Sequence, residues 1–196
     1  HDERTLDTIG LDGSNTSRFD LSGRELAVTV GGEIYQDSQE GRRDGGAVSN
    51  LFPDADMTIY GVYVDNAFAV TDALDVTAGV RFDSYDLSAS GQRSREDSAV
   101  SPRFSASYRV TEWMQPYVSY AEAFNAPSLS QLYNDGLHFR GGGPTPDNFF
   151  VPNPNLDAEK AKTWELGANF KTGQLLTSQD TLRAKVAIFR NEGTDY

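Results

Sequence analysis

The amino-acid sequence predicts an all-β fold, in which about eight antiparallel strands form part of a larger transmembrane β-barrel. Three observations lead to this prediction. Apolar side chains recur at every second position, the connections between such segments alternate between short and long, and the opposite face of the segments is polar. A period of two is the pattern of a strand that has one apolar face.

Eight segments show this alternation, five of them clearly. The clear segments, named by their alternating residues, are 26–34, 74–82, 104–110, 164–170 and 182–188. Weaker candidates lie at 4–18, 57–70 and 114–122. In segment 74–82, for example, Leu74, Val76 and Val80 share one face, whereas the intervening positions are mostly polar. The sequence therefore predicts eight strands and no convincing helix.

The connections between these segments alternate in length. Residues 20–24, 71–73 and 111–113 are short, residues 36–56, 84–99 and 123–160 are long, and residues 172–181 are intermediate. Outer-membrane barrels have this arrangement, with short periplasmic turns and longer extracellular loops. The alternation therefore favours a barrel over a soluble β-sandwich.

The same count of connections puts both chain ends, near His1 and Tyr196, on the long-loop side. Residues 191–196 resemble the beginning of another loop. Complete bacterial barrels normally start and finish on the short-turn side, and an open sheet leaves unpaired edges in lipid. We therefore expect residues 1–196 to be one partial barrel domain.

Side-chain chemistry distinguishes the two faces of the predicted sheet. Aromatic residues on the apolar face fall near the long-loop ends of the strands (Phe82, Tyr120 and Trp164) and near the short-turn ends (Tyr108 and Phe170). Two aromatic girdles have this appearance, although the core of a sandwich can also contain such residues. The opposite face carries Arg81, Asp83, Arg103, Arg109, Glu165, Arg183 and Lys185. These charges indicate a wet lumen.

Composition excludes several classes of function. Seventeen Lys and Arg against 29 Asp and Glu give a net charge of −12, which argues against nucleic acid as a partner. No apolar run approaches the roughly 18 residues of a membrane-spanning helix. Cysteine is absent, and so are the HExxH, P-loop and GxSxG motifs. The sequence predicts that the protein is not an enzyme.

The long connection at residues 123–160 holds the most distinctive chemistry. It contains five of the eight prolines, the run Gly141 to Gly143, several aromatic residues and His138, the only histidine besides His1. A neutral imidazole can bind haem iron or another metal. A single loop histidine is nevertheless more often a surface residue, so the pattern alone leaves both interpretations open.

Several motifs resemble the C-terminal half of a TonB-dependent outer-membrane receptor barrel. They are Ser101-Pro-Arg-Phe104, Tyr117-Val-Ser-Tyr-Ala-Glu-Ala-Phe124, Asn153-Pro-Asn-Leu156 and Thr163-Trp-Glu-Leu-Gly167. Phe124-Asn-Ala-Pro127 and Asn153-Pro-Asn-Leu156 are similar to the FRAP and NPNL boxes of haem receptors, with Asn125 in place of the usual Arg. The run Gln131 to Phe139 is most similar to hemophore receptors.

The resemblance implies a bacterial outer-membrane receptor that imports haem and is driven by TonB, with a barrel of about 22 strands. It implies that His138 is the haem ligand, and thus the metal ligand, because haem receptors carry a histidine between the two boxes. Tyr133, Phe139 and Phe149 are candidates to line the haem. The haem can arrive free, on haemoglobin or on a hemophore.

The family also has an N-terminal plug, a TonB box and usually a second haem ligand, none of which is found in residues 1–196. Two other functions remain open at this point. One is a ferric-siderophore receptor of the same type. The other is a soluble all-β domain that binds or hydrolyses carbohydrate.

Overall fold

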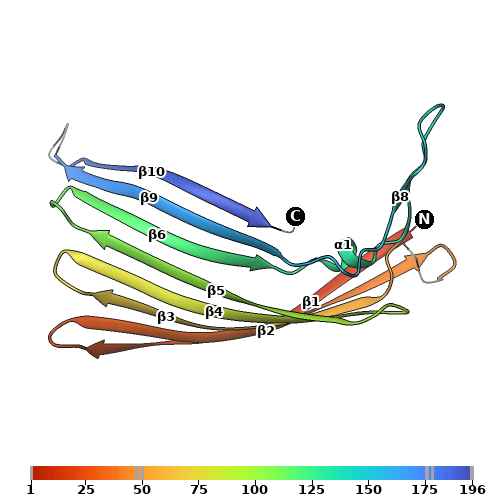
Figure 1. Cartoon of the computed structure of the whole chain (residues 1–196), viewed down its shortest axis with the longest axis horizontal. Helices are drawn as coiled ribbons and strands as arrows, with labels where there is room; N and C mark the ends of the chain where they lie inside the picture. Colours follow the sequence, from red (N-terminus) through yellow and green to blue (C-terminus); the bar gives the residue numbers. More distant parts are fainter. Residues whose placement is uncertain (1, 47–48, 50, 175–176, 178, 195–196) are drawn as a thin grey trace.

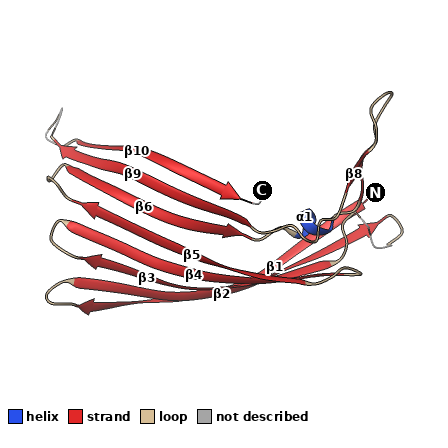
Figure 2. Cartoon of the chain, in the orientation of Figure 1, coloured by secondary structure: helices blue, strands red, loops and turns tan. Residues whose placement is uncertain are grey.

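The computed structural model describes residues 2–46, 49, 51–174, 177 and 179–194. Most of these residues belong to one curved antiparallel sheet of eight strands (Figures 1 and 2). The order of strands in the sheet is β1-β2-β3-β4-β5-β6-β9-β10. The strands are β1 (Asp2–Asp20), β2 (Glu25–Arg43), β3 (Ala55–Ala69), β4 (Leu74–Ala89), β5 (Arg95–Tyr108), β6 (Met114–Asn125), β9 (Glu159–Gly173) and β10 (Thr181–Thr194).

All eight predicted strands are confirmed, but they are longer than expected. Residues 84–99, predicted as a long loop, are mostly strand, because β4 continues to Ala89 and β5 begins at Arg95. Beyond Phe82 the apolar residues switch to the inner face, where Tyr85 and Leu87 are buried. The pattern on the outer face stops there while the hydrogen-bonded ladder continues. The prediction of a long loop here is therefore wrong.

The same extension shortens the predicted loop 36–56, since β2 runs to Arg43 and β3 begins at Ala55. The alternation of short and long connections is consequently weaker than the sequence suggested. The connection between β6 and β9, at residues 126–158, remains far longer than any other that the structure describes. The predicted terminal positions His1 and Tyr196 lie outside the described residues.

The register separates an apolar outer face from an inner face that is largely polar. Val62, Phe82 and Val100 form one row across β3, β4 and β5, and all three are exposed. Tyr120 lies opposite Trp164, with their ring centroids 4.5 Å apart, toward the long-loop end of the sheet. At the other end, Tyr108 lies opposite Leu74 and Phe170 opposite Met114. The predicted positions of Tyr108 and Phe170 near the short-turn ends are confirmed, whereas Phe82 lies near the middle of its strand, because β4 continues to Ala89.

The connection between β6 and β9 contains a short helix and a small hairpin. These are α1 (Leu129–Tyr133), β7 (Gly136–Phe139) and β8 (Asn148–Phe150). The expectation of no helix is therefore wrong. Ser128 caps α1 and forms a capping box with Gln131. Five residues are too few to display a helical period, so only the cap could have indicated the helix.

Among the described residues, no helix is long and apolar enough to cross a membrane.

The long connection folds back so that α1 packs on the inner face of the sheet, against β3 and β4 near their long-loop ends (Figure 2). The contact forms one buried apolar cluster, which we call the loop core. Its members are Ala55, Met57 and Ile59 of β3, Tyr85 and Leu87 of β4, Leu129, Leu132 and Tyr133 of α1, and Ala158. The inner face is thus apolar at the long-loop end and polar below it, rather than wet along its whole length.

Val118 and Ser119 of β6 offer a matched test of which face meets lipid. Val118 pairs with Ala106 and Leu166 on the outer face, whereas Ser119 lies one residue away on the inner face. Arginine on a lipid-facing strand position costs about 2–4 kcal/mol near the bilayer midplane. We therefore expect Val118→Arg to reduce the stability of the full-length receptor, measured by urea unfolding in lipid vesicles. Ser119→Arg is the control, and equal losses in the two variants would contradict the assignment of faces.

Candidate functional site

His138 lies in β7 and its imidazole is exposed on the small hairpin. Its Nδ1 lies 3.2 Å from Oδ1 of Asn148 in β8, and its ring centroid lies 4.4 Å from that of Phe150. An Nδ1–H group that donates to the Asn148 oxygen leaves the Nε2 lone pair available for a metal. Within the described residues, no hydrogen bond engages Nε2.

The donor set around His138 suits a metal that brings its own ligands. In the described part of the chain, no group of three or more His, Cys, Asp or Glu side chains is arranged to hold a metal ion. Haem iron already has four porphyrin nitrogens and needs protein ligands only at its axial positions. One imidazole on an apolar hairpin is therefore chemically adequate for haem, whereas it is a poor site for a bare ion.

The predicted aromatic lining is only partly supported. Phe139 and Phe149 are exposed on the hairpin, and Phe139 contacts the His138 ring edge-on at 5.5 Å. Tyr133 was expected beside them, but only 1% of it is exposed, because it belongs to the loop core. The helix turns its side chain toward the wall, so Tyr133 cannot line a ligand beside His138. Phe150, which contacts His138 most closely, was missed.

The Tyr133 hydroxyl is buried without a hydrogen-bond partner among the described residues. Burial raises the pKa of this hydroxyl, and the nearby positive charge of Arg95 opposes the increase. A neutral phenol with no role in hydrogen bonding contributes through its ring alone.

The two sequence boxes hold the base of the loop, through contacts with β4, β9 and α1. In the first box, Phe124 stacks on Tyr85 with ring centroids 5.7 Å apart, and Nδ2 of Asn125 donates to Glu159 at 3.0 Å. In the second, the amide of Asn153 donates to the carbonyl oxygen of Leu132 at 3.0 Å. The boxes are thus structural elements that join the loop to the barrel wall.

Arg95 at the start of β5 completes this attachment. Its Nη1 donates to the carbonyl oxygens of Pro154, at 3.2 Å, and Leu156. Its Nη2 lies 2.8 Å from Oδ1 of Asp157. Only 16% of the Arg95 side chain is exposed. Nothing in the sequence around Arg95 indicated this role, because its partners are about 60 residues away in the chain.

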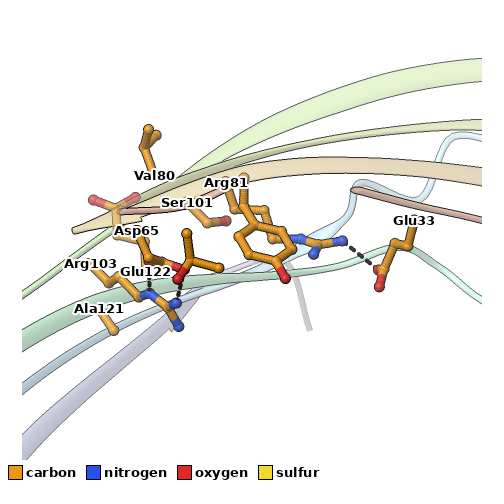
Figure 3. A pocket seen from close by; sticks show the side chains of 10 residues that line it. Glu33, Asp65, Val80, Arg81, Ser101, Arg103, Ala121 and Glu122 are labelled. Carbon is orange, nitrogen blue, oxygen red and sulfur yellow. Dashed lines mark hydrogen bonds and ion pairs between the residues drawn. The ribbon is translucent and has the colours of Figure 1, made fainter. Parts of the chain in front are cut away.

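Below the loop core, the inner wall borders a hollow of about 710 Å³ that is lined by paired charges (Figure 3). Nη2 of Arg81 lies 2.5 Å from Glu33 and 2.6 Å from Asp83. Nε of Arg103 donates to Asp65 at 2.6 Å. Arg81, Asp83 and Arg103 are among the charged residues that the sequence placed in the lumen, and the structure confirms that they lie on the inner face.

Gly61 makes room for this arrangement. A Cβ atom at Gly61 would lie 2.0 Å from Nη2 of Arg81, so a larger residue would displace the guanidinium from its position between Glu33 and Asp83. Glycine at position 61 of β3 therefore leaves the space that the Arg81 guanidinium of β4 occupies.

An antiparallel sheet with an apolar outer face, a lumen wall of paired charges and a long loop folded inward defines a membrane-barrel receptor or transporter. Comparison with known families matches residues 1–196 to the β-barrel of TonB-dependent receptor-like proteins. The chain belongs to this family. This membership removes the alternative of a soluble carbohydrate-binding or hydrolytic domain.

Individual relatives include haem receptors. The chain is 32% identical to a hemin receptor of Yersinia pestis over 99% of its own length and 29% of the relative's. It is 29% identical to the heme/hemopexin utilization protein C of Haemophilus influenzae (strain 86-028NP), over 99% of this chain and 28% of that protein. The chain therefore spans less than a third of the length of these relatives.

Two solved structures share the fold. The hemophore receptor HasR of Serratia marcescens, a double mutant in complex with its hemophore HasA and heme, matches 100% of this chain and 34% of that one with a TM-score of 0.88 and 22% identity. The siderophore receptor PirA of Pseudomonas aeruginosa matches 96% of this chain and 32% of that one, with a TM-score of 0.73 and 26% identity. Both likenesses show that this chain is part of a larger barrel.

Leu132 and Tyr133 allow the loop core to be tested by adjacent substitutions. Leu132→Ala removes a fully buried side chain and should cost about 2–5 kcal/mol in the opening free energy of segment 126–158. Tyr133→Phe removes only the unpartnered hydroxyl, so its effect should stay within about 1 kcal/mol. Native-state hydrogen exchange of the full-length receptor measures both. A Tyr133→Phe variant as unstable as Leu132→Ala would show that the hydroxyl is hydrogen-bonded.

Proposed function

We propose that the complete receptor binds haem on its extracellular side and imports it across the bacterial outer membrane, driven by TonB. One observation carries the proposal. His138 lies on an exposed hairpin with Nδ1 beside Asn148, its ring against Phe150 and Nε2 available. Family membership and the similarity to a hemin receptor support the same function.

In this proposal, His138 is an axial ligand of ferric haem through Nε2. Asn148 orients the ring because its Oδ1 accepts a hydrogen bond from the Nδ1–H group, an arrangement common among metal-binding histidines. The exposed rings of Phe139 and Phe149 supply apolar surface for the porphyrin. Haem is the transported cargo, so the protein acts as a transporter and catalyses no reaction.

We further propose that residues 1–196 supply eight strands of a barrel of about 22. The segment 126–158 is then an extracellular loop and the connections at the opposite end face the periplasm. The plug and the TonB box belong to parts of the receptor outside this chain.

The haem source is a protein partner in this proposal, either a hemophore or a haemoprotein such as haemoglobin. The support is the HasR structure, which holds a hemophore and heme, and the relative named for heme and hemopexin utilization. A net charge of −12 makes nucleic acid an unsuitable partner.

His138→Ala should weaken haem binding by the full-length receptor by about 10-fold or more, because an axial bond to iron is lost. Absorbance titration with ferric haem measures the change, and growth on haem as the iron source follows it. Asp135→Ala is the control, since Asp135 is exposed in the same loop outside the hairpin. Unchanged affinity and growth in His138→Ala would remove His138 from the site.

Asn148→Ala tests whether the orientation of the imidazole matters. It removes the group 3.2 Å from Nδ1 while leaving the ligand itself in place. Removal of an orienting partner typically costs about 10- to 100-fold in metal affinity. We expect a loss in this range by the same titration. Asn148→Asp, which keeps an acceptor at that position, should retain most of the affinity.

A ferric siderophore is the second candidate cargo, favoured by the 26% identity to the siderophore receptor PirA. Siderophores present oxygen ligands that already saturate the iron, so they would not need the His138 imidazole. Two results together would favour this candidate. The wild-type receptor would bind a ferric siderophore and no haem, and the His138→Ala variant would bind the siderophore with the same affinity.

A further inference from the structure

The position of the long loop relative to the barrel wall depends on few directional contacts. The segment between β6 and β9 carries α1, the hairpin with His138 and the Asn153 to Leu156 box. Apolar burial in the loop core attracts α1 to the wall, but the hydrophobic effect has no preferred direction. Burial alone therefore permits the loop to shift along the sheet.

Arg95 makes the directional contacts that fix the loop at one position on the sheet. One guanidinium donates to the carbonyl oxygens of Pro154 and Leu156 and pairs with Asp157. The planar fork of an arginine fixes several acceptors at once, and a lysine cannot reproduce this geometry. Because only 16% of the side chain is exposed, loss of these acceptors would leave a shielded cation without compensation.

The attachment continues from Arg95 to the helix that precedes the hairpin. Arg95 lies opposite Leu87 on β4, which is a member of the loop core. The Asn153 amide donates to the carbonyl oxygen of Leu132 in α1, and the Leu156 amide donates to Asn153. A chain of hydrogen bonds thus runs from the wall through the box to α1, three residues before β7 begins.

We propose that Arg95 is a positioning residue that fixes segment 126–158, and with it His138, relative to the barrel wall. The part of this inference that concerns haem rests on the proposed function. The part that concerns the loop does not, because the contacts of Arg95 exist in the haem-free protein. Arg95 acts through residues 153–157, since its hydrogen bonds and ion pair are with Pro154, Leu156 and Asp157.

The first test is hydrogen exchange of the haem-free, full-length receptor in outer-membrane vesicles. Arg95→Met should raise the exchange rates of the Asn153 and Leu156 amides by about 10-fold or more, as expected for the loss of charge-assisted hydrogen bonds. Arg93→Met is the matched control, since Arg93 is exposed two residues earlier. Asp157→Asn weakens the ion pair without altering β5 and should give a smaller increase. Unchanged exchange in Arg95→Met would overturn the inference.

The second test measures ferric haem affinity by absorbance titration of the same variants. We expect Arg95→Met to bind haem about 10-fold more weakly than wild type, and Arg95→Lys to lie between them because it retains the charge but not the fork. Faster exchange with unchanged haem affinity would overturn the positioning of His138. If wild type does not bind haem, the proposed function fails, while the exchange comparison still decides whether Arg95 holds the loop.

Discussion

The whole structure depends on the antiparallel ladder that joins β1 to β6 in sequence order and continues through β9 to β10. Every backbone amide and carbonyl inside a hydrocarbon layer must be paired, and a ladder of neighbouring strands does this without side chains. The side chains are then free to serve two different environments, since consecutive residues point to opposite faces. The apolar row through Val62, Phe82 and Val100 and the charged pairs behind it are both consequences of this one geometry.

The inner face performs two tasks at different heights. In its polar part, arginines and carboxylates neutralise one another, so the wall is hydrophilic without a large uncompensated charge. Toward the long-loop end, the same face becomes apolar and receives α1. The change occurs between Asp83 and Tyr85 on a single strand. A transition from polar wall to loop core within two residues explains why the loop is attached where it is.

The sequence could predict the strands because every second residue lies on the outer face and is mostly apolar, which gives the period of two. It could not predict their full extent, since Tyr85 and Leu87 are apolar on the inner face and their burial depends on a helix more than 40 positions later in the chain. Tyr133 was misassigned for a related reason, as proximity to His138 in the chain says nothing about which way a helix turns a side chain. His138 could be singled out as a candidate because histidine is rare in this sequence, whereas Arg95 is one of many arginines and only tertiary structure distinguishes it.

The length of the first two strands has a consequence for how other molecules approach. Each has 19 residues, or about 60 Å of strand, whereas about 9–11 residues suffice to cross a bilayer. In the proposed barrel, the residues of β1 and β2 beyond this length at the long-loop end extend the wall past the lipid. A protein partner of the proposed receptor therefore meets the extended ends of β1 and β2 at a distance from the bilayer surface, and the length of these strands limits how close it comes to the lipid.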